Sequence, residues 1–148
     1  MKKLFPFLFL LPSLTAFGQA SVAYYPFNTN SFLSVSTIPN RAVWLDARVQ
    51  TNTLFGSLAT TLAPMINIRR TTTANYYVGA SVRFNALNSL ADADVLEGYG
   101  LHVGVRVVPL TILPNVRVAF EVSPFARANF KSGIFYSYLG VAYQFNKK

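Results

Sequence analysis

The chain has 148 residues, of which 52% are hydrophobic and 12% are charged, with a formal net charge of +8 and no cysteine. Soluble domains carry about 25% charged residues, and beyond the N-terminal segment no stretch reaches the ~18 uninterrupted apolar residues of a spanning helix. The composition therefore argues against an ordinary soluble domain and a helical membrane protein, and the lack of cysteine excludes a disulfide scaffold, a cysteine metal site and a bacterial lipoprotein.

Residues 1–18 have the features of a secretory signal peptide. Two lysines follow the initiator methionine, a short stretch rich in Leu and Phe comes next, and the small residues Ala16 and Gly18 fit the −3 and −1 positions of a cleavage site. We expect cleavage after residue 18, with cleavage after residue 20 as the alternative. An N-terminal membrane anchor is disfavoured because the apolar stretch is short and contains two prolines. The mature domain is then residues 19–148.

Along the mature chain, apolar and polar residues alternate with a period of two, which is the pattern of strands with two unlike faces. Val103 and Val105, for example, share one face, while His102 and Arg106 share the other. The predicted strands are residues 21–27, 31–38, 41–51, 54–69, 75–84, 97–107, 115–123 and 133–145. The first of them shows the weakest pattern, so six strands are the alternative to eight. No segment of useful length has helical periodicity, which predicts an all-β fold.

Polar and proline-containing segments separate the strands. If the first strand runs outward from the periplasm, the connections alternate between an outer and an inner side of the membrane. The outer connections are residues 28–30, 52–53, 85–95 and 125–132, and the inner ones are residues 39–41, 70–74 and 110–114. The two longest connections then lie outside and the inner turns are short, as in outer-membrane barrels.

The alternation alone does not say which face lies inside. A soluble barrel buries its apolar face, whereas a membrane barrel turns that face to lipid and keeps polar side chains inside. The polar face carries few charges, although a soluble surface is about 25–35% charged. Aromatic residues also gather near strand ends, such as Tyr99 and Phe135 at one end and Tyr76 and Tyr143 at the other, which is typical of lipid–water interfaces. We therefore predict an antiparallel up-and-down transmembrane β-barrel of eight strands in the cell outer membrane, with outer-membrane lipid around it.

The signal peptide, the alternating strands and the final Tyr143-Gln144-Phe145 resemble small eight-stranded outer-membrane barrels of Gram-negative bacteria, of the OmpX and OmpA-barrel type. A last strand that ends in alternating aromatic residues and a Phe is similar to the signal read by the barrel-assembly machinery, so the resemblance implies that machinery as a partner during biogenesis. The chain departs from the pattern in the three residues 146–148 that follow the Phe. The resemblance implies a location rather than one activity, because relatives include tethers, adhesins and lipid-modifying enzymes. We expect a monomer.

Charged residues on the polar face form a candidate network inside the barrel. The network comprises Asp46, Arg48, Arg83, Arg106, Arg117 and Glu121. The alternation of residues along the fourth predicted strand places Arg69 on the same face. We expect Asp46 and Glu121 to pair with arginines, because an ionised carboxylate in a poorly hydrated interior is costly unless it is paired. Eight strands enclose an interior just wide enough for side chains, which predicts a plugged barrel. The excess of arginine keeps an anion-preferring pore as the functional alternative.

Other polar residues give no catalytic, metal or cofactor site. His102 is the only histidine, and no trio of serine, histidine and acid is evident around it. Asp92, Asp94 and Glu97 lie close together but lack the full pattern of a calcium loop. The arginines are scattered singly, so nucleic-acid binding is not predicted.

The sequence thus predicts a non-enzymatic outer-membrane barrel that stabilises the envelope or presents surface loops. The alternatives are a lipid-modifying outer-membrane enzyme and a soluble periplasmic lipocalin-like binding barrel. The orientation also predicts that Val103→Arg, on the lipid face, costs more stability than Gly104→Ser, on the interior face.

Overall fold

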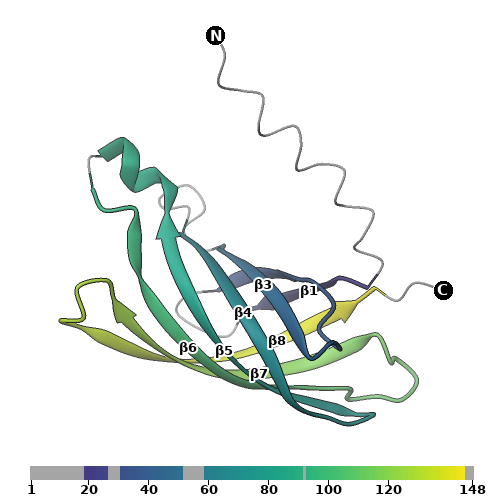
Figure 1. Ribbon diagram of the computed structural model, residues 1–148. Helices are drawn as coiled ribbons and strands as arrows, with labels where there is room; N and C mark the ends of the chain where they lie inside the picture. Colours follow the sequence, from purple (N-terminus) through teal and green to yellow (C-terminus); the bar gives the residue numbers. More distant parts are fainter. Residues whose placement is uncertain (1–18, 27–30, 52–58, 92, 146–148) are drawn as a thin grey trace.

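A computed structural model describes residues 19–26, 31–51, 59–91 and 93–145. They form a closed antiparallel barrel in which each strand pairs with its neighbour in sequence and the last strand pairs with the first (Figure 1). The strands are β1 (Ser21–Tyr25), β2 (Phe32–Ser36), β3 (Val43–Gln50), β4 (Ala59–Arg70), β5 (Ala74–Asn85), β6 (Leu96–Val107), β7 (Val116–Arg127) and β8 (Gly133–Gln144). Among these described residues, no helix has the length and apolar character needed to cross a membrane.

The prediction of an all-β, up-and-down barrel of eight strands is confirmed. The weakest predicted strand is present as β1, which pairs with β2 on one side and with β8 on the other. Two details differ from the prediction. A 3₁₀ helix, Ala86–Ala91, occupies part of the connection between β5 and β6. Strand β7 also continues through Pro124 to Arg127, because the ladder to β8 is kept at Pro124↔Phe135 even though proline has no N–H to donate.

The polar face of the strands lies inside the barrel and the apolar face lies outside. On β3, Asp46 and Arg48 are buried, whereas Val43 and Leu45 are 62% and 44% exposed. The same alternation holds on β6, where His102 is buried and Leu101 is 61% exposed. The interior is thus built from polar, charged and aromatic side chains, and the outer surface is a band of Leu, Val and Ile.

One predicted interior residue lies on the other face. The ladder between β4 and β5 shifts register between Asn67 and Arg69, so that Arg69 pairs with Tyr76. Arg69 and Tyr76 are both exposed. The prediction that Arg69 belongs to the interior network is wrong, because an inserted residue in a strand reverses the alternation beyond it.

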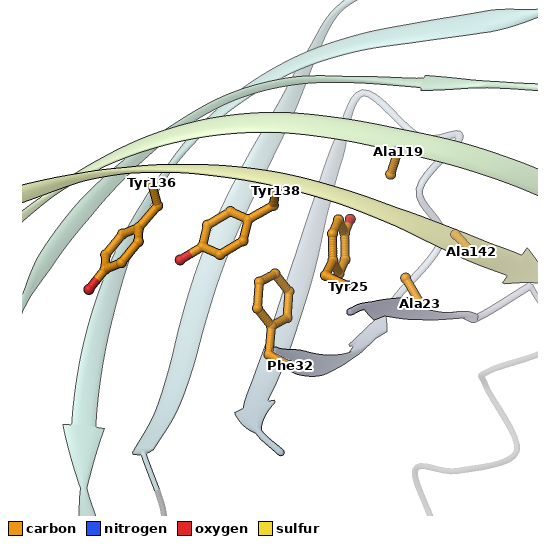
Figure 2. Packing of buried hydrophobic residues seen from close by; sticks show 7 residues of the cluster. All are labelled: Ala23, Tyr25, Phe32, Ala119, Tyr136, Tyr138 and Ala142. Atoms are coloured by element: carbon orange, nitrogen blue, oxygen red, sulfur yellow. The ribbon is translucent and has the colours of Figure 1, made fainter. Parts of the chain in front are cut away.

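Aromatic rings fill one part of the interior. Tyr25 and Phe32 stack with their ring centroids 4.4 Å apart, and Tyr138 meets Phe32 edge-on at 4.8 Å. Figure 2 shows these rings and that of Tyr136 pointing from the neighbouring strands β1, β2 and β8 into the same space. A second buried cluster consists of Trp44, Ala63, Met65 and Tyr77. The interior is therefore packed with side chains around its charged groups.

Candidate functional site

Arg48 joins two carboxylates that come from different strands. Its Nε donates to Oδ2 of Asp46 at 2.8 Å, and Asp46 lies two residues away on the same face of β3. Its Nη1 and Nη2 donate to the two carboxylate oxygens of Glu121 on β7, at 2.6 and 2.8 Å. The Oγ atoms of Ser34 and Ser36 on β2 donate to Oδ1 of Asp46. All the donor nitrogens of this guanidinium group thus face carboxylates, which is the strongest geometry available to a buried arginine.

Glu121 extends this chain to a histidine and a serine. His102 Nδ1 lies 2.8 Å from Oε1 of Glu121, and Tyr77 donates its hydroxyl to Oε2 at 2.8 Å. An ionised carboxylate only accepts hydrogen bonds, so Nδ1 carries a proton. Nε2 lies 2.7 Å from Oγ of Ser81, and in the neutral imidazole it accepts the hydrogen of that hydroxyl. Arg48 Nη1 is also 3.4 Å from Nδ1, but a protonated Nδ1 cannot accept its hydrogen.

Glycines of β6 let side chains from the neighbouring strands reach one another. Gly100 pairs with Ser81 and Gly104 pairs with Tyr77. A Cβ atom added at Gly100 would lie 2.6 Å from Oγ of Ser81, and one added at Gly104 would lie 2.4 Å from Cζ of Tyr77. The polar chain can therefore cross the inner face of β6 only because these two positions have no side chain.

Arg106 has a different environment from Arg48, although both are buried. Its Nη2 donates to Oγ of Ser36 at 3.2 Å, and its guanidinium group lies over the rings of Trp44 and Tyr77, at 4.5 and 5.8 Å from their centroids. Nε and Nη1 of Arg106 are buried without a hydrogen-bond partner. Among the described residues, no carboxylate lies within ion-pair distance of Arg106. Aromatic faces take the place of a counter-ion here.

Arg83 and Arg117, the other two arginines of the predicted network, form none of the ion pairs found among the described residues. Arg83 packs over the rings of Phe125 and Tyr136, at 4.4 and 5.6 Å from their centroids, and its Nε is 3.4 Å from Oγ1 of Thr61. Arg117 is partly buried, and its Nε has no hydrogen-bond partner. The structure thus brings Asp46, Arg48 and Glu121 together and leaves three arginines apart from them.

A small cavity adjoins the serine and histidine. It has a volume of about 20 Å³ and is lined by polar side chains that include Ser81, Arg83, His102 and Ser123. That volume has room for one water molecule with several polar partners. In the described part of the chain, no group of three or more His, Asp and Glu residues is placed to hold a metal ion. Asp92, one of the three acidic residues considered for calcium, lies outside the described residues.

No trio of serine, histidine and acid was evident in the sequence, but the structure brings three such side chains together. Ser81, His102 and Glu121 are connected side chain to side chain, from three consecutive strands. The alternation of apolar and polar residues along β5, β6 and β7 puts all three side chains on the polar face. Their mutual distances, however, depend on the registers of β5, β6 and β7, which a single sequence does not reveal.

Comparisons of the chain with models of protein families, with curated proteins and with solved structures found no match. The resemblance to small outer-membrane barrels therefore rests on architecture, of which the closed antiparallel eight-stranded barrel is present. What the interior side chains do has to be inferred from their own geometry.

Proposed function

We propose that the mature chain is an integral β-barrel of the bacterial outer membrane whose interior is filled by side chains and does not conduct ions. The observation that carries the proposal is the inverted distribution of side chains. Arg48, Asp46 and Glu121 are buried inside, while Ile66, Leu101 and other large apolar residues cover the outside. In water such a continuous apolar surface would promote aggregation, whereas in a bilayer it is the stable arrangement.

Exposed aromatic residues at both ends of the barrel support the same placement. Tyr76 near the start of β5 and Tyr143 near the end of β8 are exposed at the end of the barrel where β1 begins and β8 ends. Tyr99, Phe130 and Phe135 are exposed at the opposite end, and the rings of Tyr99 and Phe130 stack at 5.6 Å. Aromatic rings at two levels, with an aliphatic band between them, match the two interfaces of a membrane.

The packed interior supports a plug. Ion pairs, the aromatic cluster and the second cluster around Trp44 occupy the space that a pore would need. A barrel of this kind can stabilise the envelope or present its connections at the cell surface without any chemical step, which is the role we favour.

Fractionation of the native envelope tests the proposal. We expect the protein in the outer-membrane fraction, with a gel mobility that changes on boiling, and an N-terminus at Gln19. Purified protein in a planar bilayer should show no steady current. Recovery in the soluble periplasm would support the lipocalin-like alternative instead, and a large steady current would replace the plug with a pore.

One observation favours a second candidate, a lipid-modifying enzyme of the same architecture. Ser81, His102 and Glu121 have the hydrogen-bond connections of a nucleophile, a base and the acid that orients the base.

A further inference from the structure

A pocket with a volume of about 420 Å³ opens at the end of the barrel toward which β8 runs (Figure 1). The connections that follow β2, β4 and β6 border it, together with residues of β7 and β8. None of the described residues that line it is acidic. The polar side chains of its lining are those of Asn40, Thr72, Thr73, Thr111, Arg117 and Gln144. A cation, two amides and three hydroxyl groups around one pocket suit a small polar anion.

Arg106, Arg117 and Gln144 follow a diagonal line across the inner faces of β6, β7 and β8 toward this pocket. Arg106 pairs with Ala119, which lies two residues after Arg117 on β7. Arg117 pairs with Ala142, which lies two residues before Gln144 on β8. Residues offset by two positions on paired strands share a face, and their long side chains can reach one another. The line therefore runs from the deeply buried Arg106 to the lining of the pocket.

These three side chains carry buried polar atoms that have no hydrogen-bond partner among the described residues. The atoms are Nε and Nη1 of Arg106, Nε of Arg117 and Oε1 of Gln144. Arg106 and Gln144 are only 1% and 2% exposed. Because nearly all buried polar groups in proteins are hydrogen-bonded, a group of such atoms beside a pocket indicates a ligand.

The positive charge of Arg117 is not balanced by a carboxylate. The two buried carboxylates of the described interior, Asp46 and Glu121, both form ion pairs with Arg48. Nη1 of Arg117 lies 3.1 Å from the side-chain amide of Asn75, which positions the guanidinium group but carries no charge. Water can complete the hydrogen bonds of Arg117 but leaves its charge uncompensated, whereas an anion does both.

We propose that this pocket binds inorganic phosphate, with Arg117 as its cation and Gln144 as the acceptor of its hydroxyl hydrogen. Arginine matches the oxygens of phosphate, and the threonine hydroxyls of the connections can donate to the same ion. Phosphate keeps at least one P–OH group at neutral pH, so it can also donate to Oε1 of Gln144. Carboxylates, sulfate and phosphodiesters have no such hydrogen and leave that oxygen without a partner.

Calorimetric titration with inorganic phosphate tests the site in the full mature barrel, in detergent micelles and a phosphate-free buffer at neutral pH. We expect saturable binding. Arg117→Gln should weaken it at least about tenfold, because a charged hydrogen-bond donor is lost. Arg69→Gln is the matched control, because it removes the same charge at the same end of the barrel but from the outer face. It should bind phosphate as the parent does.

A second pair of variants leaves the strands unchanged. Thr111 lies in the exposed connection between β6 and β7 and borders the pocket. Thr111→Glu should weaken phosphate binding at least about tenfold through charge repulsion, and Thr111→Gln should weaken it much less.

Two results would overturn the site. One is a folded parent that binds no phosphate. The other is equal binding by the members of both pairs of variants, because the affinity would then be independent of charge at the pocket. Heat-modifiability, recorded on each sample, shows that the barrel has formed. Since the pocket lies at the end of the barrel, the proposal can fail while the membrane placement holds.

Competing anions test the role of Gln144. We expect the parent to bind sulfate at least about tenfold more weakly than phosphate, and Gln144→Leu to lose that preference. Dihexanoyl phosphatidylglycerol supplies the phosphodiester of a lipid headgroup and should bind no better than sulfate. Tighter binding of this lipid than of phosphate would overturn the assignment to free phosphate and favour a headgroup. A parent that does not distinguish phosphate from sulfate would overturn the role of Gln144.

Discussion

Arg48 and Arg106 are two buried guanidinium groups in one barrel, 4% and 1% exposed. Each lies over two aromatic rings, which for Arg48 are those of Tyr25 and Phe32 at 6.0 and 4.9 Å. Arg48 makes hydrogen-bonded ion pairs with two carboxylates. Arg106 has one serine hydroxyl and two aromatic faces, and two of its nitrogens lack a partner. The interior therefore contains a compensated and an uncompensated cation within the same set of strands.

The difference separates two ways of holding a charge away from water. A buried pair depends on both members, since removing one leaves the other charge desolvated and alone. A cation held by ring faces and a hydroxyl leaves no opposite charge behind when it is removed. Replacing Arg48 should consequently lower the stability of the barrel much more than replacing Arg106. An arginine introduced on the outer face of the barrel provides a third case for comparison.

Arg48→Met should have the largest effect. It leaves Asp46 and Glu121 without their shared cation, and we expect the free energy of unfolding to fall by about 3–5 kcal/mol. Guanidinium titration of the folded barrel in detergent measures it. Arg41→Met is the control at an exposed position and should stay within about 0.5 kcal/mol. A small loss for Arg48→Met would mean that the carboxylates reach water.

Val103→Arg places a guanidinium group on the outer face of the strand that also carries Arg106. Val103 is 52% exposed and lies in the middle of β6, so near a bilayer midplane the substitution should cost about 2–4 kcal/mol. The measurement is unfolding from lipid vesicles. Val95→Arg, just before β6, is the matched control and should cost about 0–1 kcal/mol near the interface. Equal values for the two would contradict the membrane placement.

Ser36→Ala removes a hydroxyl that serves both regions. Its Oγ donates to Asp46 at 2.8 Å and accepts from Arg106 at 3.2 Å. We expect a loss of about 1 kcal/mol, the usual net value of such a bond, in the same guanidinium titration. No change on substitution would show that Ser34 alone satisfies that oxygen of Asp46.

Arg106→Met should have the smallest effect. The change removes one hydrogen bond and two ring contacts, but it also removes two buried donors without partners and an uncompensated charge. Replacing buried charge by an apolar side chain of similar length is often neutral, so we expect a loss below about 1 kcal/mol. A loss as large as that of Arg48→Met would end the distinction between the two arginines.

The alternation in the sequence predicted an antiparallel barrel of eight strands, with six as the alternative, and the face on which most side chains lie. It could not predict register. The alternation of residues predicts Arg69 inside the barrel, whereas a bulge after Asn67 places it outside. The alternation also puts Ser81, His102 and Glu121 on one face, but only the pairing of three strands brings their polar atoms within hydrogen-bond distance.

Packing inside the barrel was equally hidden. The sequence predicts that Gly104→Ser costs less stability than Val103→Arg, because Gly104 faces the interior. The first side-chain atom there would lie 2.4 Å from Cζ of Tyr77 and 2.9 Å from the carbonyl oxygen of Phe120. Gly104→Ser therefore requires Tyr77 and the backbone of β7 to move, a cost that the sequence did not indicate. Polarity can be inferred from a sequence, whereas free volume depends on neighbours that are distant along it.

The seam that closes the barrel brings the two ends of the folded chain together. Ser21 pairs with Gln144 and Val22 with Tyr143, through only four pairs, whereas the ladder between β5 and β6 contains eleven (Figure 1). Pairing of β1 with β8 closes the longest loop in the barrel. The entropic cost of closing a loop grows as about (3/2)RT ln n, where n is the number of residues enclosed. The hairpins of the second half can assemble locally as they emerge, but the circle cannot be completed until β8 is available to β1. Until then β1 and β8 each expose an unpaired edge that could pair with another chain. The barrel is therefore protected from mispairing only when its last step, the pairing of β8 with β1, is complete.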